Sequence, residues 1–142
     1  EQKSNDFHDI REINTPAAFE EWNEVVEQVF GNRKNQALYH LMMKGHSYTF
    51  FGYYQQNKLV ATTLLYMQDD IAGVHLVGTV KDARGKGIGT QITMRAFDHA
   101  RKKGASIGVL QASPMGNPMY KKIGFKSFSN ISHWEYISPS QQ

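Results

Sequence analysis

Two long stretches of the sequence place apolar residues at the three-to-four-residue spacing of an amphipathic helix. The first follows Asn14-Thr15-Pro16, a polar cap with a proline in the first turn, and ends at Gly31. The second carries three cations in its last turn and ends at Gly104. Two shorter apolar runs indicate further helices. We expect helices at residues 16–30, 34–44, 87–103 and 115–122.

β-prone runs occupy the remaining apolar positions. Two of them flank the turn Gln56-Asn57 and form a hairpin, and the turn Gln68-Asp69-Asp70 leads into a third antiparallel strand. The short apolar run after the long second helix is expected to be the parallel neighbour of that third strand. A closing hairpin is expected across Ser129-Asn130. The predicted strands lie at residues 7–13, 48–55, 58–67, 71–80, 106–111, 126–128 and 132–137.

These elements predict an α/β (α+β) fold with a mixed, mostly antiparallel central sheet of six to seven strands and helices on both faces. With 142 residues, the chain is expected to form one domain, residues 1–142, with frayed ends at 1–6 and 138–142. The missing initiator Met indicates trimming or a longer parent chain. No apolar run reaches the roughly 18 residues of a membrane span, so we expect a cytoplasmic protein without membrane partners.

Composition limits the chemistry further. The chain has no cysteine, which excludes disulfides, thiolate zinc sites and a cysteine nucleophile. The histidines show no metal-ligand spacing, and no metal is expected. The net charge of +3 suits a polyanionic small ligand as well as nucleic acid. The basic flank of the second long helix is better explained as a solvated face, because no aromatic stripe accompanies it.

The glycine-rich stretch Arg84-Gly85-Lys86-Gly87-Ile88-Gly89-Thr90 lies between a predicted strand and the long second helix. Backbone N–H groups in such a turn form an anion-binding concavity, and the helix adds the positive end of its dipole. The stretch is not a Walker A loop, because Gly87 follows Gly85-Lys86 where Ser or Thr is needed. It is not a dinucleotide fingerprint either, because antiparallel strands precede it. A phosphate-bearing ligand is predicted.

A second motif lies downstream, where Tyr120 precedes Gly124-Phe125 in a Tyr-x-x-x-Gly-Phe pattern. Together, the Arg-x-x-Gly-x-Gly loop and this pattern resemble the GNAT superfamily of acyl-CoA-dependent N-acyltransferases. The resemblance is strong over residues 71–128 and rests only on the order of elements before that. It implies that acetyl-CoA is the acyl donor, with Arg84, Gly85, Lys86, Gly87, Ile88, Gly89 and Thr90 at its pyrophosphate. It also implies direct transfer to a primary amine of a small molecule or peptide.

Transfer from a thioester to an amine needs an oxyanion site and a proton for the departing thiolate. If the strand before the loop splays around Gly78, its free backbone can bind the pantetheine amides, and an N–H of Val77 or Thr79 can face the carbonyl oxygen. Family members place a tyrosine near the sulfur, which makes Tyr120 the candidate acid, although it could equally pack the short helix. Ser113 stands where the family often has Asn, as a cofactor contact, a helix cap or both.

The general base stays open. Many family members have Glu where His75 stands, and an imidazole has a pKa suited to the task. A structural His75 is the competing interpretation, with a water chain, Glu21, Glu24 or Asp69 as the base. A non-catalytic acyl-CoA-binding or regulatory module is the rival function. A homodimer through the sheet or the C-terminal strands is possible, without a sequence feature that supports it.

The acceptor is expected to lie between the first two helices and the strand ends. Aromatic side chains form its walls or fill the core, and the sequence leaves both open. These residues are Trp22, Phe30, Tyr39, Tyr48, Phe50, Tyr53 and Trp134. Glutamates of the first helix, Glu20, Glu24 and Glu27, are better explained as its solvated face than as an amine-attracting cluster.

Overall fold

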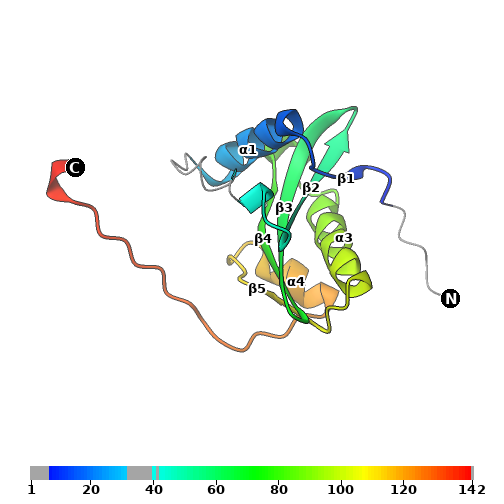
Figure 1. Cartoon of the computed structure of the whole chain (residues 1–142). Coiled ribbons are helices and arrows are strands. Elements are labelled where there is room, and N and C mark those ends of the chain that lie inside the picture. The colour runs from blue at the N-terminus through cyan, green and yellow to red at the C-terminus, as the bar shows by residue number, and fades with distance from the viewer. Residues whose placement is uncertain (1–6, 32–39, 41, 142) are drawn as a thin grey trace.

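The computed structural model describes residues 7–31, 40 and 42–141, and its centre is a five-stranded mixed sheet in the order β1-β2-β3-β4-β5 (Figure 1). Strands β1 to β4 are antiparallel neighbours, and β5 is parallel to β4. The strands are β1 (Ile10–Glu12), β2 (Tyr48–Gln55), β3 (Lys58–Gln68), β4 (Ile71–Thr79) and β5 (Ile107–Leu110). The predicted hairpin and the predicted parallel pair are both present.

Helices cover both faces of this sheet (Figure 1). They are α1 (Pro16–Phe30), α3 (Ile88–Lys102) and α4 (Asn117–Ile123), with 3-10 turns at Lys81–Ala83 and Pro139–Gln141. The predicted cap of α1 is confirmed, because the Thr15 Oγ1 accepts a hydrogen bond from the Ala18 N–H at 3.2 Å. Most of the helix predicted at residues 34–44 lies outside the described residues, including Tyr39.

The apolar core lies in two layers, one on each face of the sheet. On the α1 face, Phe19, Trp22 and Val26 pack against Phe50 and Leu64. The buried Trp22 indole donates its N–H to the Phe51 carbonyl at 3.1 Å. On the α3 face, the buried side chains are Ile10, Phe51, Tyr53, Val60, Ala61, Leu65, Ala72, Val74, Ala83, Ile88, Ile92, Ala96 and Ala100. Each large side chain buried in this way stabilises the fold by about 1.5–3 kcal/mol.

The prediction of six to seven strands is wrong for the described part of the chain, which has five. Residues 126–128 and 132–137 form no hairpin and have no regular secondary structure. An isolated hairpin is at best marginally stable in water, and this segment lies along no other strand. Trp134 therefore lies in neither the core nor an aromatic wall, since 89% of it is exposed.

Strand β4 contains a bulge. Thr62 pairs with Gly78 and Leu64 with His75, so Leu76 and Val77 together oppose the single residue Thr63. Leu76 has a φ of 53°, a left-handed conformation that is rare for a branched side chain. The bulge changes the direction of β4 just before the glycine-rich loop.

Candidate active site

The glycine-rich loop runs from the 3-10 turn at Lys81–Ala83 into the first turn of α3. Gly85 and Gly87 each have a φ of 77°, and a Cβ on either would meet no atom within 4 Å. Backbone conformation, not crowding, therefore requires glycine at both positions. The buried side chains of Ala83 and Ile88 fix the two ends of the loop in the core.

The first turn of α3 presents free backbone donors. The first N–H that bonds back within the helix is that of Gln91, which donates to the Gly87 carbonyl at 3.1 Å. The N–H groups of Ile88, Gly89 and Thr90 precede it and have no partner inside the helix. Together with the helix dipole, these donors form a site for an anion.

The Arg84 side chain is tied to the end of β4. Its Nε donates to the Thr79 carbonyl at 2.9 Å, and the residue is otherwise exposed. This contact holds the guanidinium beside the end of β4. Lys86 lies exposed in the same loop.

Strand β4 separates from β5 before it reaches the loop. The two strands pair only from Ile71 to Val74, although β4 continues to Thr79. The Val80 N–H donates to the Val60 carbonyl in β3, so strand alternation turns the N–H groups of Val77 and Thr79 away from β3. They face the side that β5 has left. The predicted splay therefore exists, but it begins at Val74, earlier than Gly78.

Gly78 has a different role from the expected kink. A Cβ at Gly78 would lie 2.7 Å from Cε2 of Phe30 and 2.8 Å from Cγ1 of Val29. The glycine lets the end of α1 approach the splayed part of β4. The kink itself lies at Leu76, two residues earlier in the chain.

Two threonines of β3 support the bulge, and the sequence analysis missed them. The Thr62 Oγ1 donates to the Leu76 carbonyl at 3.0 Å, and the Thr63 Oγ1 donates to the His75 carbonyl at 3.3 Å. Both threonines are fully buried. A pair of hydroxyl side chains inside an otherwise apolar strand was the available signal, because buried polar groups need partners.

Helix α4 lies next to the start of α3. Met119 packs against the start of α3, where a Cβ on Gly89 would lie 3.1 Å from its Sδ. The adjacent Tyr120 is buried, its ring against Gly116 and 6.2 Å from the ring of Phe125. Burial raises the pKa of the Tyr120 phenol above its ordinary value of 10.0, so the hydroxyl stays protonated at neutral pH.

Ser113 lies in the turn that precedes α4. Its Oγ accepts a hydrogen bond from the Gly116 N–H at 3.2 Å, and its carbonyl accepts one from the Asn117 N–H at 3.0 Å. Ser113 therefore closes the turn before α4, but it is not the N-cap of that helix, which is Gly116 and makes no side-chain cap hydrogen bond. The residue is exposed and near the Tyr120 ring, since both lie within 4 Å of a Cβ built on Gly116.

His75 lies in β4 directly before the bulge. Its Nε2 would be 3.0 Å from a Cβ on Gly73, so the imidazole covers that glycine on the α1 face of the sheet. His75 is exposed overall, but burial of part of the side chain lowers the pKa of His75 from 6.5. No contact within the described part of the chain joins His75 to Tyr120.

The aromatic residues expected to line the acceptor site lie partly in the core and partly at the surface. Trp22, Phe50 and Tyr53 are buried and belong to the core. Tyr48 is half-buried, and its ring lies 4.8 Å from that of Tyr66 on the same face as His75. Glu20 and Glu24 are exposed on α1, as expected for its solvated side, whereas Glu27 is half-buried. Glu21 is exposed as well.

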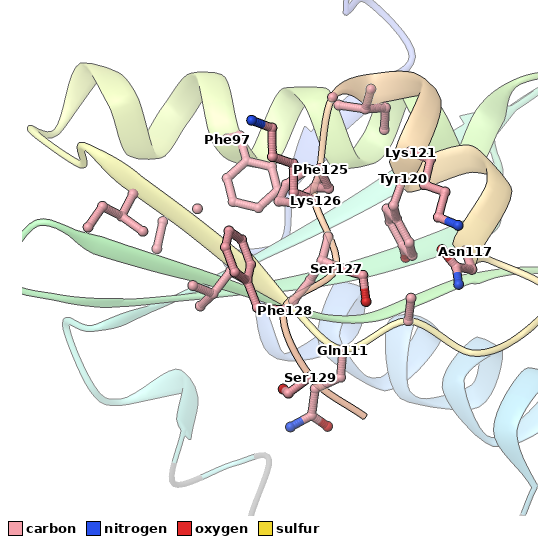
Figure 2. Close-up of a pocket in the computed structure, with 18 of the residues that line it drawn as sticks. Phe97, Gln111, Asn117, Tyr120, Lys121, Phe125, Lys126, Ser127, Phe128 and Ser129 are labelled. Carbon is pink, nitrogen blue, oxygen red and sulfur yellow. The ribbon is translucent and has the colours of Figure 1, made fainter. Parts of the chain in front are cut away.

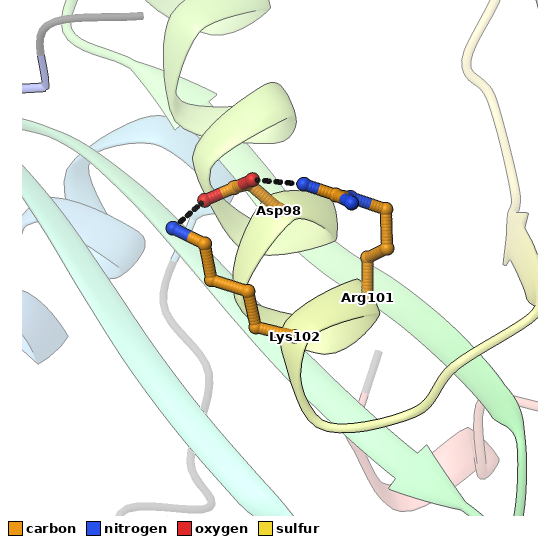
Figure 3. Close-up of polar contacts among 3 residues, drawn as sticks. All are labelled: Asp98, Arg101 and Lys102. Atoms are coloured by element: carbon orange, nitrogen blue, oxygen red, sulfur yellow. Dashed lines mark hydrogen bonds and ion pairs between the residues drawn. The ribbon is translucent and has the colours of Figure 1, made fainter. Parts of the chain in front are cut away.

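The basic flank of α3 is partly neutralised by its own helix. Asp98 pairs with Lys102 at 2.7 Å and with Arg101 at 3.2 Å (Figure 3). The hydrogen bond from Lys102, more than any other contact, lowers the pKa of the Asp98 carboxyl. Arg95 lies over the Phe51 ring, with its Cζ 4.8 Å from the ring centre. Three of these cations thus have structural partners within the domain.

A large open cavity lies on the far side of β5. It has a volume of about 1650 Å³, and its walls come from α3, β5, α4 and residues 125–131 (Figure 2). Phe97 and Phe125 meet in it, with ring centres 5.2 Å apart. Tyr120 and Ser113 belong to its wall, but the loop from Arg84 to Thr90 does not. The cavity is therefore distinct from the anion site.

The comparisons with known proteins identify the family. The acetyltransferase (GNAT) domain matches residues 13–137, which is most of the chain. This chain belongs to the GNAT acetyltransferase family. The sequence has no significant match among curated proteins.

Solved structures share this GNAT fold at low sequence identity. A Trypanosoma brucei acetyltransferase is 17% identical with a TM-score of 0.77, over 89% of this chain and 98% of the other. AAC(6′)-Iy, in complex with a bisubstrate analogue of CoA and acetylneamine, is 13% identical with a TM-score of 0.78, over 92% and 98%. Glucosamine-6-phosphate N-acetyltransferase from Arabidopsis thaliana is 15% identical with a TM-score of 0.71, over 91% and 99%. At these identities the likeness concerns the fold.

Within residues 7–31, 40 and 42–141, no three His, Asp or Glu side chains come together as metal ligands would. None of the described helices has the length and hydropathy needed to cross a bilayer.

Proposed function

We propose that this GNAT protein is an acetyl-CoA-dependent N-acetyltransferase that transfers an acetyl group directly to a primary amine. One observation carries the proposal: the anion site of the loop adjoins both the unpaired end of β4, through the Arg84–Thr79 contact, and helix α4, through the Gly89–Met119 contact. Helix α4 also carries the buried phenol of Tyr120. A diphosphate, an amide-bearing arm and a thioester follow one another in the same order along CoA.

The donor is held by backbone more than by side chains. The pyrophosphate accepts hydrogen bonds from the free N–H groups of the loop and of the start of α3. The side chains of Arg84 and Lys86 balance its negative charge. The pantetheine amides pair with the open backbone of Val77 and Thr79, as an added strand would. The hydroxyl of Ser113, in the turn before α4, adds a polar contact to the pantetheine arm.

The chemical step uses the groups at the end of this arm. The amine nitrogen attacks the thioester carbon, the new C–N bond forms, and the oxyanion accepts a hydrogen bond from the N–H of Val77 or Thr79. The attached nitrogen loses its extra proton to solvent, the C–S bond breaks, and the Tyr120 hydroxyl gives its proton to the CoA thiolate. Its raised pKa keeps Tyr120 protonated before the step, and solvent restores the proton afterwards.

His75 is the base in this proposal. The attacking amine must be neutral, and an alkylamine with a pKa near ~10.4 is mostly protonated at pH 7. The lowered pKa of His75 leaves its imidazole neutral at that pH and able to accept a proton. His75 is exposed, so the proton of the acceptor ammonium passes to it through water.

Amino sugars are the first acceptors to test. The fold is shared with AAC(6′)-Iy, crystallised with a bisubstrate analogue of acetylneamine, and with a glucosamine-6-phosphate N-acetyltransferase. Tyr48 and Tyr66 form a half-exposed aromatic surface on the face of His75, and such a surface suits a sugar ring. Peptide N-termini and lysine side chains are the second class.

The experiment combines binding with turnover. Calorimetry with acetyl-CoA measures donor binding, and release of free CoA thiol is followed with a panel of amino sugars, polyamines and peptides. The proposal expects micromolar binding and amine-dependent thiol release. Tight binding without release by any amine would favour a non-catalytic acyl-CoA-binding module instead. Nucleic-acid binding with a steep salt dependence and no CoA binding would contradict both.

A further inference from the structure

Two neighbouring hydroxyl groups of β3 bind two consecutive carbonyls at the bulge of β4. The Thr62 Oγ1 donates to the Leu76 carbonyl at 3.0 Å, and the Thr63 Oγ1 donates to the His75 carbonyl at 3.3 Å. Both threonines are 0% exposed. A hydroxyl buried among apolar side chains is costly unless it is hydrogen-bonded, so each threonine holds its carbonyl firmly.

Each of these carbonyls shares a rigid peptide unit with the N–H of the following residue. No peptide bond in the described part of the chain is cis, so each N–H points opposite to the carbonyl of its own peptide. Thr62 directs the Leu76 carbonyl toward β3, and the Val77 N–H is therefore directed away from β3. In the same way, Thr63 holds the His75 carbonyl and directs the Leu76 N–H away from β3.

The side away from β3 is the one that β5 has left. Pairing between β4 and β5 ends at Val74, before the bulge. In a regular strand, consecutive N–H groups point to opposite sides. The φ of 53° at Leu76 breaks this alternation and directs the N–H groups of Leu76 and Val77 to the same open side. Two adjacent N–H groups on one side can bind a single oxyanion.

Thr79, the other candidate donor to the thioester oxygen, is held differently. Its carbonyl accepts the hydrogen bond from Arg84, which links Thr79 to the glycine-rich loop. The carbonyl of the peptide that carries the Thr79 N–H belongs to Gly78, which pairs with Thr62 in the regular ladder. Thr79 therefore suits the pantetheine arm near the pyrophosphate, and the bulge suits the thioester.

We propose that Thr62 and Thr63 are positioning residues for acetyl transfer, a role that rests on the N-acetyltransferase function proposed above. Each hydroxyl orients and polarises one peptide, which makes the N–H of Val77 and of Leu76 a stronger donor to the thioester oxygen as that oxygen gains negative charge. The two hydroxyls are buried behind the strand and touch neither substrate. They hold the bulge in the geometry of the tetrahedral intermediate before the substrates bind.

A matched pair of substitutions at Thr62 tests this role. Thr62→Val keeps the shape of the side chain and removes the hydroxyl, whereas Thr62→Ser keeps the hydroxyl and removes the methyl group. Loss of a whole oxyanion donor costs about 10²–10³-fold in kcat, so a donor that is only displaced should cost about 10-fold or more in Thr62→Val. Thr62→Ser should retain most of kcat. Calorimetry should give the same acetyl-CoA affinity for both variants as for the unmodified protein.

Two further variants complete the kinetic test. Thr63→Val should lower kcat less than Thr62→Val, because its hydrogen bond is longer. Tyr53→Phe removes a different buried hydroxyl, which donates to the Asp9 carboxylate at 3.4 Å, and should leave kcat unchanged. Circular dichroism and urea denaturation verify that each variant is folded at the assay temperature, so that a lower kcat does not reflect unfolded protein.

Amide NMR of the isotope-labelled protein gives a readout that is independent of turnover. CoA lacks the acyl carbonyl that acetyl-CoA carries, so an amide that donates to this oxygen should differ between the two complexes. The Val77 amide proton is expected to move downfield from the CoA complex to the acetyl-CoA complex. This difference should be smaller in Thr62→Val and retained in Thr62→Ser, and the Thr79 amide should be alike in both complexes.

The outcomes separate this role from the proposed function. Equal kcat in Thr62→Val, Thr63→Val and an active unmodified protein would overturn the positioning role alone. A shift at Thr79 instead of Val77 would overturn it too, because the oxyanion donor would then lie outside the bulge. If the unmodified chain releases no thiol with any amine, the proposed function fails. The Val77 shift alone then decides whether the threonines orient the bulge toward a bound thioester.

Discussion

At the scale of single residues, burial shifts the pKa of Tyr120 and of His75 in opposite directions. Burial disfavours the charged form, so the phenol holds its proton more firmly and the imidazole holds one less firmly. At pH 7 Tyr120 is therefore a donor and His75 an acceptor. This division of roles is what acyl transfer from a thioester to an ammonium group needs.

The pH dependence of catalysis tests His75. Because its pKa lies below 6.5, kcat/KM should decrease as the pH falls through that lowered value. His75→Ala should lose this acidic limb and about 10²-fold or more of kcat/KM. Both proteins are assayed with the same amine, so that the ionisation of the acceptor is common to the two profiles.

An unchanged profile in His75→Ala would exclude His75 as the base. Asp69, Glu21 and Glu24, each replaced by its amide, are then the next variants. If water alone deprotonates the amine, the pH profiles of all four variants should match that of the unmodified protein.

A second histidine links pH to stability. The Nε2 of His99 is buried without a hydrogen-bond partner, and burial, with Lys103 nearby, lowers the pKa of His99 from 6.5. The unfolded chain binds that proton near pH ~6.5, whereas the folded chain binds it only at lower pH. The free energy of unfolding should therefore decrease as the pH falls below about 6.5.

Urea denaturation at several pH values measures this effect. His99→Leu should reduce the loss of stability between pH 7 and pH 5, because Leu fits the apolar contact with Phe51 without titrating. The exposed His46→Gln is the control and should leave the pH dependence as it is. Equal pH dependence in all three proteins would contradict this account of His99.

At the scale of elements, the proposed donor site combines the start of α3 with the end of β4. Strand β4 stops pairing with β5 after Val74, and the positive φ values of Gly85 and Gly87 direct the loop into the helix. Strain at Leu76, of order 1–3 kcal/mol for such a conformation, is held by the hydrogen bonds from Thr62 and Thr63.

A matched pair of glycine substitutions separates binding from strain. Gly87→Ala should cost about 1–2 kcal/mol of stability, because φ is 77° there, and should weaken acetyl-CoA binding at least ~10-fold. Gly104→Ala also has a positive φ and open space around its Cβ, but it lies after the C-terminal end of α3. It should show the same loss of stability with unchanged binding by calorimetry. Equal effects on binding would remove the loop from the donor site.

At the scale of the whole molecule, the sequence predicted most of the central sheet but not its far edge. Alternating and helical patterns located the hairpin, the parallel pair and both long helices, because each buries a face in its own chain. The same pattern in residues 126–137 predicted a hairpin that is absent. Alternation of apolar and polar residues shows that a segment can form a strand. It does not show which edge of a sheet, if any, that segment pairs with.

Part of the candidate site could likewise be predicted from the sequence, and part could not. Motifs predicted the glycine-rich turn at a helix start, since glycine at positive φ leaves a clear local signal. The two threonines of β3 indicate that buried hydroxyls need partners, but not that those partners are the Leu76 and His75 carbonyls of a bulge. The sequence analysis assigned Gly78 to a kink in β4. In the structure, the missing side chain of Gly78 instead lets Phe30 pack closely against the strand.

The rate of CoA release with and without the Tyr120 hydroxyl tests the central claim most directly. The assay uses the best amine of the panel at saturating acetyl-CoA, with calorimetry of both proteins to verify donor binding. The account predicts that Tyr120→Phe binds acetyl-CoA as tightly as the unmodified protein but turns over about 10²-fold more slowly. Equal turnover in the two proteins would contradict the proposed role of Tyr120.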